Sequence, residues 1–252
     1  MSDEILQQLR IVMVYPAHPG NIGAAARAVK NMGLSKLVLV SPNRFPSFEA
    51  YQRAASADDV LDRASVVETL QQALRGCVYV AGTSARSRTL DWQVNGPDVC
   101  AQKCLGATTE GEVAIVFGRE RSGLTNKELE QCNSLVHIPT DTAYSSLNVA
   151  AAIQIMTYEL RRTMLKNRAM PEVKPEPKYR EDLPASADQL DGLYQHLYAT
   201  LTELRFFGSH HPEKLMRRIK SLFNRAATTQ REVAIFRGIC SAIQGRKTAA
   251  KK

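Results

Sequence analysis

The chain has 252 residues, of which 44% are hydrophobic and 23% charged, and its formal net charge is +8 at pH 7, all ordinary for a soluble globular protein. Its start, Met1-Ser2-Asp3-Glu4, has neither the basic residues nor the apolar run of a signal peptide, and no apolar run is long enough to span a bilayer. These features argue against a secreted or membrane-bound protein, so we expect a soluble protein of the cytoplasm.

Short apolar runs rich in β-branched residues recur through the first 140 residues. Their continuous apolarity indicates strands buried on both faces, as in a parallel sheet covered by helices. Stretches with a helical pattern alternate with these runs, which predicts an α/β fold. The predicted strands are 11–15, 37–40, 78–80, 113–117 and 135–138, and the predicted helices are 22–32, 58–74, 125–132 and 146–166.

The first candidate site segment is Asn21-Ile-Gly-Ala-Ala-Ala-Arg27, which follows the first predicted strand and a turn. Asn21 is a favourable helix N-cap residue, and the small residues after it let the helix pack closely on its sheet. The position of Arg27, two turns into such a helix, favours contact with an anion. An ordinary helix with a surface arginine explains this segment equally well when it is taken alone.

The second candidate segment runs from the strand 113–117 through the polar loop that begins at Gly118. Ligands of open α/β sheets bind at the carboxyl ends of the strands, so this loop is a candidate ligand site. Gly118 lets a ligand approach the backbone, and Glu120 could accept hydrogen bonds from a ligand or fix a neighbouring loop. A plain strand–loop–helix unit explains the glycines but not the adjacent Arg119, Glu120 and Arg121.

The third candidate segment begins where the last predicted strand ends, at Ile138, and leads through a polar loop into an alanine-rich helix. The loop ends in Tyr144-Ser145-Ser146-Leu147-Asn148. Helix capping explains one of these polar residues but not the whole Ser-Ser-Leu-Asn group.

Four prolines among charged residues indicate an extended linker over 167–185. Ser186 and Gln189 then have the spacing of a capping box, and the following pattern is helical up to the C-terminus. Residues 161–252 hold 19 Lys/Arg against 9 Asp/Glu, a net charge of +10, whereas residues 1–160 hold 14 against 16, a net charge of −2. The asymmetry indicates a polyanion-binding extension, and nucleic acid fits better than an anionic membrane because no large apolar face accompanies the charge.

Three arginines on the polar face of the second predicted helix of this extension, Arg217, Arg218 and Arg225, are candidate phosphate contacts. A solvated helix face is the alternative. The five cysteines are scattered, and neither they nor the five histidines have the spacing of a zinc site, so we expect reduced thiols and no metal.

In this order, the three candidate segments resemble the motifs of the SPOUT superfamily of RNA methyltransferases, over residues 8–165. The early Asn…Arg, the Phe-Gly-x-Glu-x-x-Gly-Leu and the Ser-Ser-Leu-Asn are similar to those of its 2′-O-ribose methylating branch. The linker, the basic extension and Gly82-Thr-Ser-Ala-Arg-Ser-Arg88 are similar to the bacterial tRNA (cytidine/uridine-2′-O-)-methyltransferases of that superfamily.

The resemblance implies a parallel α/β sheet with a C-terminal trefoil knot, followed by a small helical extension, in a homodimer whose active site lies at the subunit interface. It implies a SPOUT domain over 1–166, the linker over 167–185 and an RNA-binding extension over 186–252. The implied reaction is methylation of a tRNA ribose 2′-hydroxyl by S-adenosyl-L-methionine without a metal, at the first nucleotide of the anticodon loop (position 32, cytidine or uridine).

By motif matching, the resemblance also implies roles for individual residues. The implied catalytic residues are Arg27, Glu120, Ser146 and Asn148. A guanidinium is a poor base, so we expect Arg27 to hold the adjacent phosphate and stabilise developing alkoxide charge. The implied methyl-donor residues are Thr83, Ser84, Ala85, Gly118, Ile138, Ser145, Ser146 and Leu147, and the implied RNA contacts are Arg86, Arg88 and Tyr144 together with the three arginines of the extension.

Two alternatives remain at this point. A 2′-O-methyltransferase of ribosomal RNA is one, although such enzymes often carry an N-terminal RNA-binding domain, and this chain enters its first predicted strand by residue 11. A non-catalytic RNA-binding protein with a degenerate fold is the other. The presence of all four implied catalytic residues argues against it.

Overall fold

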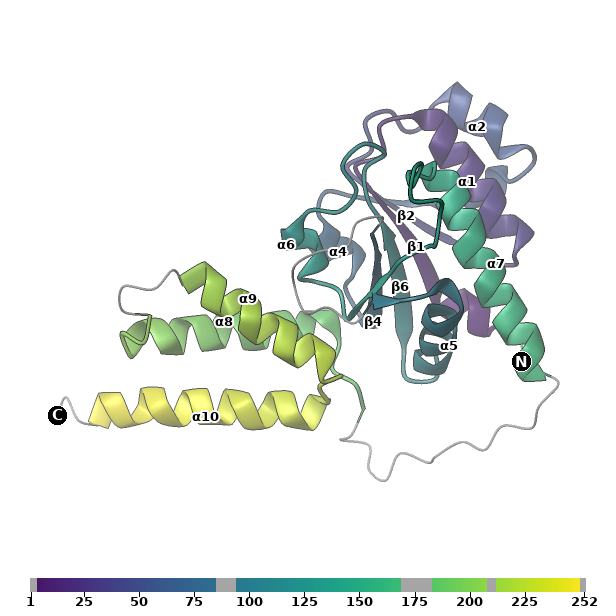
Figure 1. Ribbon diagram of the computed structural model, residues 1–252. Coiled ribbons are helices and arrows are strands. Elements are labelled where there is room, and N and C mark those ends of the chain that lie inside the picture. The colour runs from purple at the N-terminus through teal and green to yellow at the C-terminus, as the bar shows by residue number, and fades with distance from the viewer. Residues whose placement is uncertain (1–3, 85–93, 169–182, 208–211, 250–252) are drawn as a thin grey trace.

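The computed structural model describes residues 4–84, 94–168, 183–207 and 212–249 (Figure 1). Seven strands form one sheet in the order β3-β2-β1-β6-β4-β7-β5, and every neighbouring pair is parallel. The predicted parallel α/β fold is therefore confirmed. The strands are β1 (Leu9–Val14), β2 (Lys36–Val40), β3 (Ser65–Val67), β4 (Cys77–Thr83), β5 (Val94–Asn95), β6 (Glu112–Phe117) and β7 (Ser134–Val136).

Helices cover both faces of the sheet, which explains the continuous apolarity of its central strands. Along β1, Ile11 and Met13 pack into the core between one face of the sheet and a first set of helices. Val12 and Val14 pack into a separate core on the opposite face. The first set is α1 (Pro19–Asn31), α2 (Phe48–Ala54), α3 (Asp58–Asp62), α5 (Pro97–Ala107) and α7 (Val149–Arg168); the second is α4 (Leu70–Ala73) and α6 (Asn126–Leu129).

The predicted single helix over 58–74 is wrong, because this stretch contains α3, β3 and α4. The strand β3 lies at the edge of the sheet and leaves Val66 53% exposed, so its sequence lacks the apolar run of a buried strand. Thr69 then starts α4 with a capping box, in which its side chain accepts a hydrogen bond from the Gln72 N–H. The pattern also did not predict α2, α5 or the two-residue β5.

The start of α1 also differs from the prediction. The helix begins at Pro19, with His18 at the N-cap position, so Asn21 lies inside the first turn and does not cap it. The close approach of the small residues is to α2, because a Cβ on Gly23 would lie 2.0 Å from the Ala50 carbonyl oxygen.

The C-terminal extension contains α8 (Ala187–Glu203), α9 (Pro212–Arg225) and α10 (Gln230–Ala249). The predicted capping box at Ser186 is confirmed. The three helices share a core of their own that includes Leu193, Tyr194 and Phe223, whereas Leu204 and Leu222 are 41% and 54% exposed.

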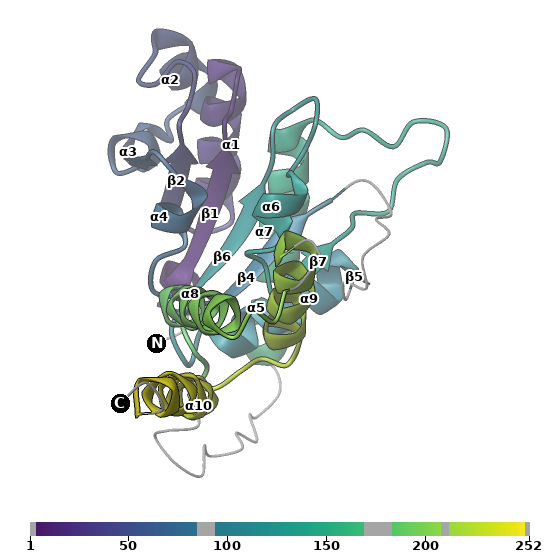
Figure 2. The ribbon, with the colours of Figure 1, turned by 90° about the vertical axis from the view of Figure 1, so that its left-hand side faces the viewer.

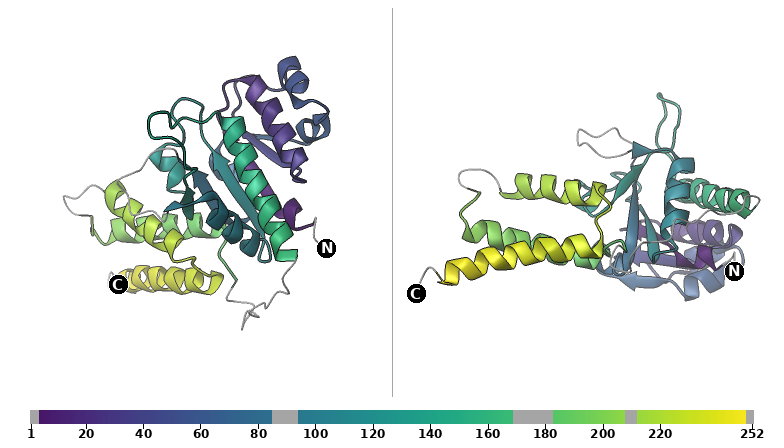
Figure 3. Two further views of the ribbon diagram at one scale, coloured as in Figure 1. Left: turned by 45° about the vertical axis from the view of Figure 1, so that its right-hand side comes forward. Right: turned by 90° about the horizontal axis from the view of Figure 1, so that it is seen from below.

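The extension projects from one side of the sheet domain (Figure 3). Its helices α8 and α9 lie next to α4 and α6, and α10 lies farther out (Figure 2). Within the described ranges, no helix has both the length and the apolarity that crossing a bilayer requires.

Candidate functional site

A pocket of about 240 Å³ opens beyond the carboxyl ends of the adjacent strands β6, β4 and β7. This is where open α/β sheets bind ligands. Three loops, which follow these strands, form its walls. Seven of the eight residues predicted to hold a methyl donor line this one pocket: Thr83, Ser84, Gly118, Ile138, Ser145, Ser146 and Leu147. The eighth, Ala85, lies outside the described residues.

The loop after β6 folds back tightly on its own first residue. Arg119 and Gly123 exchange backbone hydrogen bonds, of which Gly123 N–H to the Arg119 carbonyl is the shorter at 2.9 Å. A Cβ on Gly118 would lie 2.1 Å from the Gly123 carbonyl carbon and 2.3 Å from the Leu124 nitrogen. The loop itself therefore requires a residue without a side chain at position 118, beyond any need for a ligand to approach the backbone.

The loop after β4 is held by hydrogen bonds to both neighbouring strands. The Thr83 hydroxyl donates to the Val116 carbonyl (3.0 Å), and the Ser84 N–H donates to the Val136 carbonyl (3.0 Å). His137, the residue after β7, donates from Nδ1 to the Ser84 carbonyl (3.0 Å). Three separate contacts thus fix the backbone of this pocket wall.

Glu120 binds the start of α1. Its carboxylate accepts hydrogen bonds from the Ala17 N–H (3.2 Å), the His18 N–H (3.3 Å) and the Asn21 side chain (3.0 Å). Partial burial alone would raise the pKa of Glu120, but the bonds from Asn21 and from backbone N–H groups outweigh it and lower the pKa below its ordinary value. The carboxylate is therefore ionised at neutral pH and fixes a neighbouring loop, one of the two functions predicted for it.

Asn148 links the third segment to the first. Its Oδ1 accepts from the Ala150 N–H (2.9 Å), so it caps α7, and its Nδ2 donates to Asn21 Oδ1 (3.0 Å). Asn21 thus bridges Asn148 and Glu120 and brings the three candidate segments into one hydrogen-bonded network. The sequence placed Asn21 in a candidate site segment but predicted that it caps the helix. The local sequence around an asparagine that caps a helix and around one that bridges two other loops is the same.

Arg119 is a further residue of the site that was not predicted. Its guanidinium forms a bidentate pair with Glu128 (3.0 and 2.9 Å) and lies over the Tyr15 ring, 4.3 Å from the centroid. Burial alone would raise the pKa of Glu128, but hydrogen bonds from Arg119 and the Thr125 N–H lower it. Glu128 also completes the capping box of α6 with Thr125.

Other predicted site residues lie away from this pocket. Arg27 is exposed on α1 and does not line it. Tyr144 is 81% exposed in the loop before α7. In the extension Arg217 forms an ion pair with Glu130 at the end of α6, whereas Arg218 and Arg225 are exposed on α9. Arg86 and Arg88 lie outside the described residues.

No group of three or more His, Cys, Asp or Glu side chains in the described part of the chain is placed to hold a metal ion. All five cysteines are buried as free thiols.

Comparison with known proteins gives two family matches and close full-length relatives. Residues 8–158 match the SpoU rRNA Methylase family, and residues 188–252 match the tRNA methyltransferase TrmJ, C-terminal domain. The tRNA (cytidine/uridine/adenosine-2′-O-)-methyltransferase TrmJ of Pseudomonas aeruginosa is 46% identical over 245 residues, 95% of each chain. The tRNA (cytidine/uridine-2′-O-)-methyltransferase TrmJ of Pectobacterium atrosepticum is 44% identical over 95% of this chain and 98% of its own.

Solved structures give the same assignment. TrmJ from Z. mobilis ZM4 superposes with a TM-score of 0.79 at 29% identity, over 93% of this chain and 98% of its own. A probable methylase family protein from Haemophilus influenzae Rd KW20 superposes with a TM-score of 0.64 at 37% identity, over 97% and 99%. The chain therefore belongs to the SpoU methylase family, within the group of TrmJ proteins that carry the same C-terminal domain.

Proposed function

We propose that the chain transfers a methyl group from S-adenosyl-L-methionine to a ribose 2′-hydroxyl of tRNA, at the first nucleotide of the anticodon loop (position 32, cytidine or uridine). The observation that carries this proposal is the convergence of the loops after β4, β6 and β7 on one pocket, in a chain that also has a TrmJ C-terminal domain. The names of the full-length relatives, all tRNA 2′-O-methyltransferases, support the substrate.

The pocket fits the methyl donor in its chemistry. Apolar side chains, including Val136, Ile138 and Leu147, suit the faces of an adenine, and the hydroxyls of Thr83, Ser84, Ser145 and Ser146 suit a ribose and an amino-acid group. Gly118, which the folded loop requires, is itself part of the pocket lining. When bound, S-adenosyl-L-methionine supplies an electrophilic methyl group.

The chain's own residues must align a weakly nucleophilic ribose hydroxyl with that group. Glu120, already hydrogen-bonded to the start of α1, acts as a positioning residue through Asn21 and Asn148. Ser146, exposed at the pocket rim, is free to meet the substrate. Arg27 holds the phosphate next to the target ribose and stabilises negative charge on the attacking oxygen, since a guanidinium stays protonated.

The exposed position of Arg27, outside the pocket of its own chain, supports a homodimer with the active site at the subunit interface. The RNA contacts we propose are Arg86, Arg88 and Tyr144, together with Arg217, Arg218 and Arg225 on the extension. We assign the protein to the cytoplasm, where tRNA is modified, and the family's trefoil knot to the loops around the pocket.

A methyl-transfer assay with purified chain and labelled S-adenosyl-L-methionine tests the proposal. We expect label in an unmodified tRNA transcript and none in the same transcript with 2′-deoxyribose at position 32. Label in the deoxy transcript would refute the assigned position. Label in ribosomal RNA fragments but not in tRNA would favour an rRNA enzyme, and absence of donor binding by calorimetry would leave a non-catalytic RNA-binding protein.

A further inference from the structure

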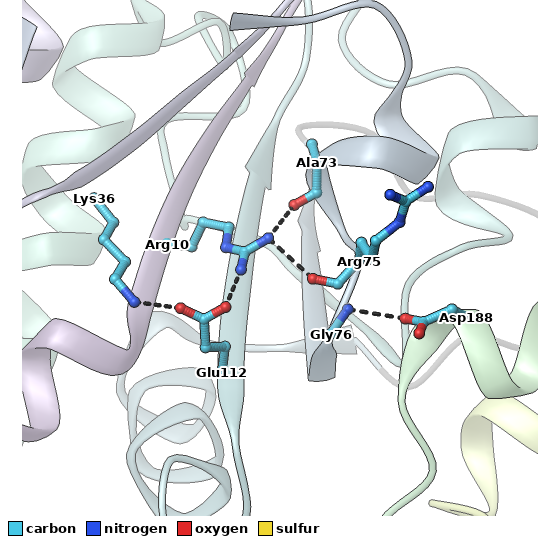
Figure 4. A network of polar contacts seen from close by, with 7 residues as sticks. All are labelled: Arg10, Lys36, Ala73, Arg75, Gly76, Glu112 and Asp188. Carbon is cyan, nitrogen blue, oxygen red and sulfur yellow. Dashed lines mark hydrogen bonds and ion pairs between the residues drawn. The ribbon is translucent and has the colours of Figure 1, made fainter. Parts of the chain in front are cut away.

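The extension contacts the sheet domain at two separate places, and the first is the turn between α4 and β4 (Figure 4). Asp188, at the start of α8, accepts a hydrogen bond from the Gly76 N–H (2.8 Å). From the other side, Arg10 donates to the carbonyls of Ala73 (2.6 Å) and Arg75 (3.2 Å). Glu112 pairs with Arg10 and with Lys36, so this turn is fixed by the sheet itself.

The second contact lies at the end of α6, where Arg217 of α9 pairs with Glu130 and where Asn224 of α9 is 5% exposed. Asn224 Nδ2 donates to the carbonyls of Glu130 (2.8 Å) and Cys132 (3.3 Å), and its Oδ1 accepts from the Tyr194 hydroxyl (2.8 Å). The two carbonyls follow the end of α6, where carbonyl groups have no partner within the helix. Asn224 therefore uses three of its hydrogen-bonding positions to join α8 and α9 to the end of α6.

The segment 125–132 that Asn224 holds also contacts two of the three pocket walls, at the loop after β6 and at the end of β4. Glu128 holds Arg119, the second residue of the loop after β6, in a bidentate pair. Cys132 Sγ lies 2.8 Å from where a Cβ on Gly82 would be, so it packs directly against the residue before Thr83. One short segment thus contacts the extension on one side and two pocket walls on the other.

We propose that Asn224 is a positioning residue for the methyl-donor pocket. By holding the end of α6, it keeps Glu128 and Cys132 in place and so orders the loops at Arg119–Gly123 and Thr83–Ser84. The methyl-donor half of this inference rests on the proposed function. Because linkage is reciprocal, any ligand that stabilises the docked extension also favours donor binding, so RNA on the extension and donor in the pocket bind cooperatively.

Hydrogen–deuterium exchange on the full chain without ligand tests the structural half. The variant is Asn224→Ala. Asp188→Ala is the matched control, because it removes the acceptor for the Gly76 N–H at the turn, a contact of the same extension that does not reach the pocket. We expect Asn224→Ala to speed exchange in 119–132 and at Ser84, and Asp188→Ala to speed exchange only around Gly76. Far-UV circular dichroism confirms that helices α8 to α10 remain folded.

Titration of S-adenosyl-L-methionine by calorimetry without RNA tests the effect of Asn224 on methyl-donor binding. We expect Asn224→Ala to weaken binding roughly fivefold, as for other couplings between distant sites, and Asp188→Ala to leave it unchanged. Unchanged exchange in 119–132 in the Asn224 variant would overturn the inference, as would equal loss of affinity in both variants. A wild-type chain that shows the expected exchange but binds no donor would overturn the proposed function and leave the role of Asn224 in ordering the loops standing.

If Asn224→Ala unfolds the extension, Glu128→Gln makes the same test from the other end of α6. It weakens the Arg119 pair while Asn224 keeps its contacts. We expect faster exchange at 119–123 with no change in α9. Protection equal to wild type at 119–123 would overturn the inference.

Discussion

Asn148 donates a hydrogen bond to Asn21, and these two asparagines, 127 positions apart in the sequence, join the start of α7 to the first turn of α1 (Nδ2–Oδ1, 3.0 Å). Asn21 in turn donates a hydrogen bond from Nδ2 to the Glu120 carboxylate, in the loop after β6 (3.0 Å). A side-chain amide can donate and accept at once, whereas a carboxylate only accepts. Asn21 is thus suited to join an acceptor on one side to a donor on the other.

We predict that Asn21→Asp lowers turnover more than it lowers stability. An aspartate can still accept from Asn148, but it places a second negative charge against Glu120. Because misplacement of reacting groups by about 1 Å can cost 10²-fold, kcat should fall roughly 10- to 100-fold. Steady-state kinetics with tRNA measure this effect. The control is Asn31→Asp, at the exposed end of the same helix. Equal kcat in both variants would contradict the network.

Glu120 predicts a pH dependence of stability. The pKa of Glu120 is lowered in the folded state. Its contribution to the free energy of unfolding is therefore complete above its unfolded pKa of about 4.5 and is lost as the pH falls through its lower folded pKa. In Glu120→Gln this contribution is absent at every pH. The difference in Tm between wild type and the variant should therefore be largest near neutral pH and shrink below pH 4.5. Thermal unfolding between pH 3 and 8 measures this difference in Tm. A difference that grows as the pH falls would contradict the prediction.

Gly118→Ala should disrupt the pocket. A Cβ there would overlap backbone atoms of Gly123 and Leu124, which cannot move without opening the loop. We expect a loss of about 1–3 kcal/mol in the free energy of unfolding, as for other overpacked sites, and a loss of donor affinity of roughly tenfold or more. Chemical denaturation and calorimetry measure the two effects.

The control for that prediction is Gly106→Ala, on α5, where a Cβ would meet nothing within 4 Å. Alanine is the better helix former by about 1 kcal/mol, so this variant should be stabilised. A Gly118 variant that behaves like the Gly106 variant would show that the loop tolerates a side chain.

The sequence predicted the central strands and the loops after β6 and β7 because each has a local signal, whereas the loop after β4 was implied only by the family resemblance. Val113–Phe117, for example, is continuously apolar and ends in a glycine, and the structure has β6 there. Edge elements have no such signal. The strand β3 is half exposed, and β5 has two residues, so neither has enough apolar residues to show a period.

The contacts that order the site were harder to predict, since they join residues distant in the sequence. Nothing near Arg217 distinguishes a phosphate contact from a partner of Glu130, and the structure makes it the latter in the chain without RNA. The same holds for Asn21, whose partners Glu120 and Asn148 come from two other segments. A residue type constrains which bonds a side chain can form, and the fold decides which partner is within reach.

Arg27→Lys tests whether the guanidinium has a bidentate role. Lysine keeps the charge but offers a single ammonium in place of the planar fork that matches a phosphate. We expect kcat to fall roughly tenfold or more, with unchanged affinity for S-adenosyl-L-methionine, because Arg27 does not line that pocket. Nearly full turnover would refute the bidentate role, and a loss of donor affinity would place the side chain in the pocket.

The exposed arginines of α9 should contribute to RNA affinity through counterion release. Each phosphate contact that is lost lowers the slope of log Kd against log salt by roughly one. Arg218→Gln with Arg225→Gln should therefore reduce the slope by about two for any tRNA sequence. Filter binding at 50 to 200 mM salt measures the slopes. A control for the loss of a positive charge elsewhere is Arg63→Gln, on the α3 side, where Asp59 already pairs with the arginine. An unchanged slope in the double variant would make the two arginines part of a solvated helix face that does not meet the RNA.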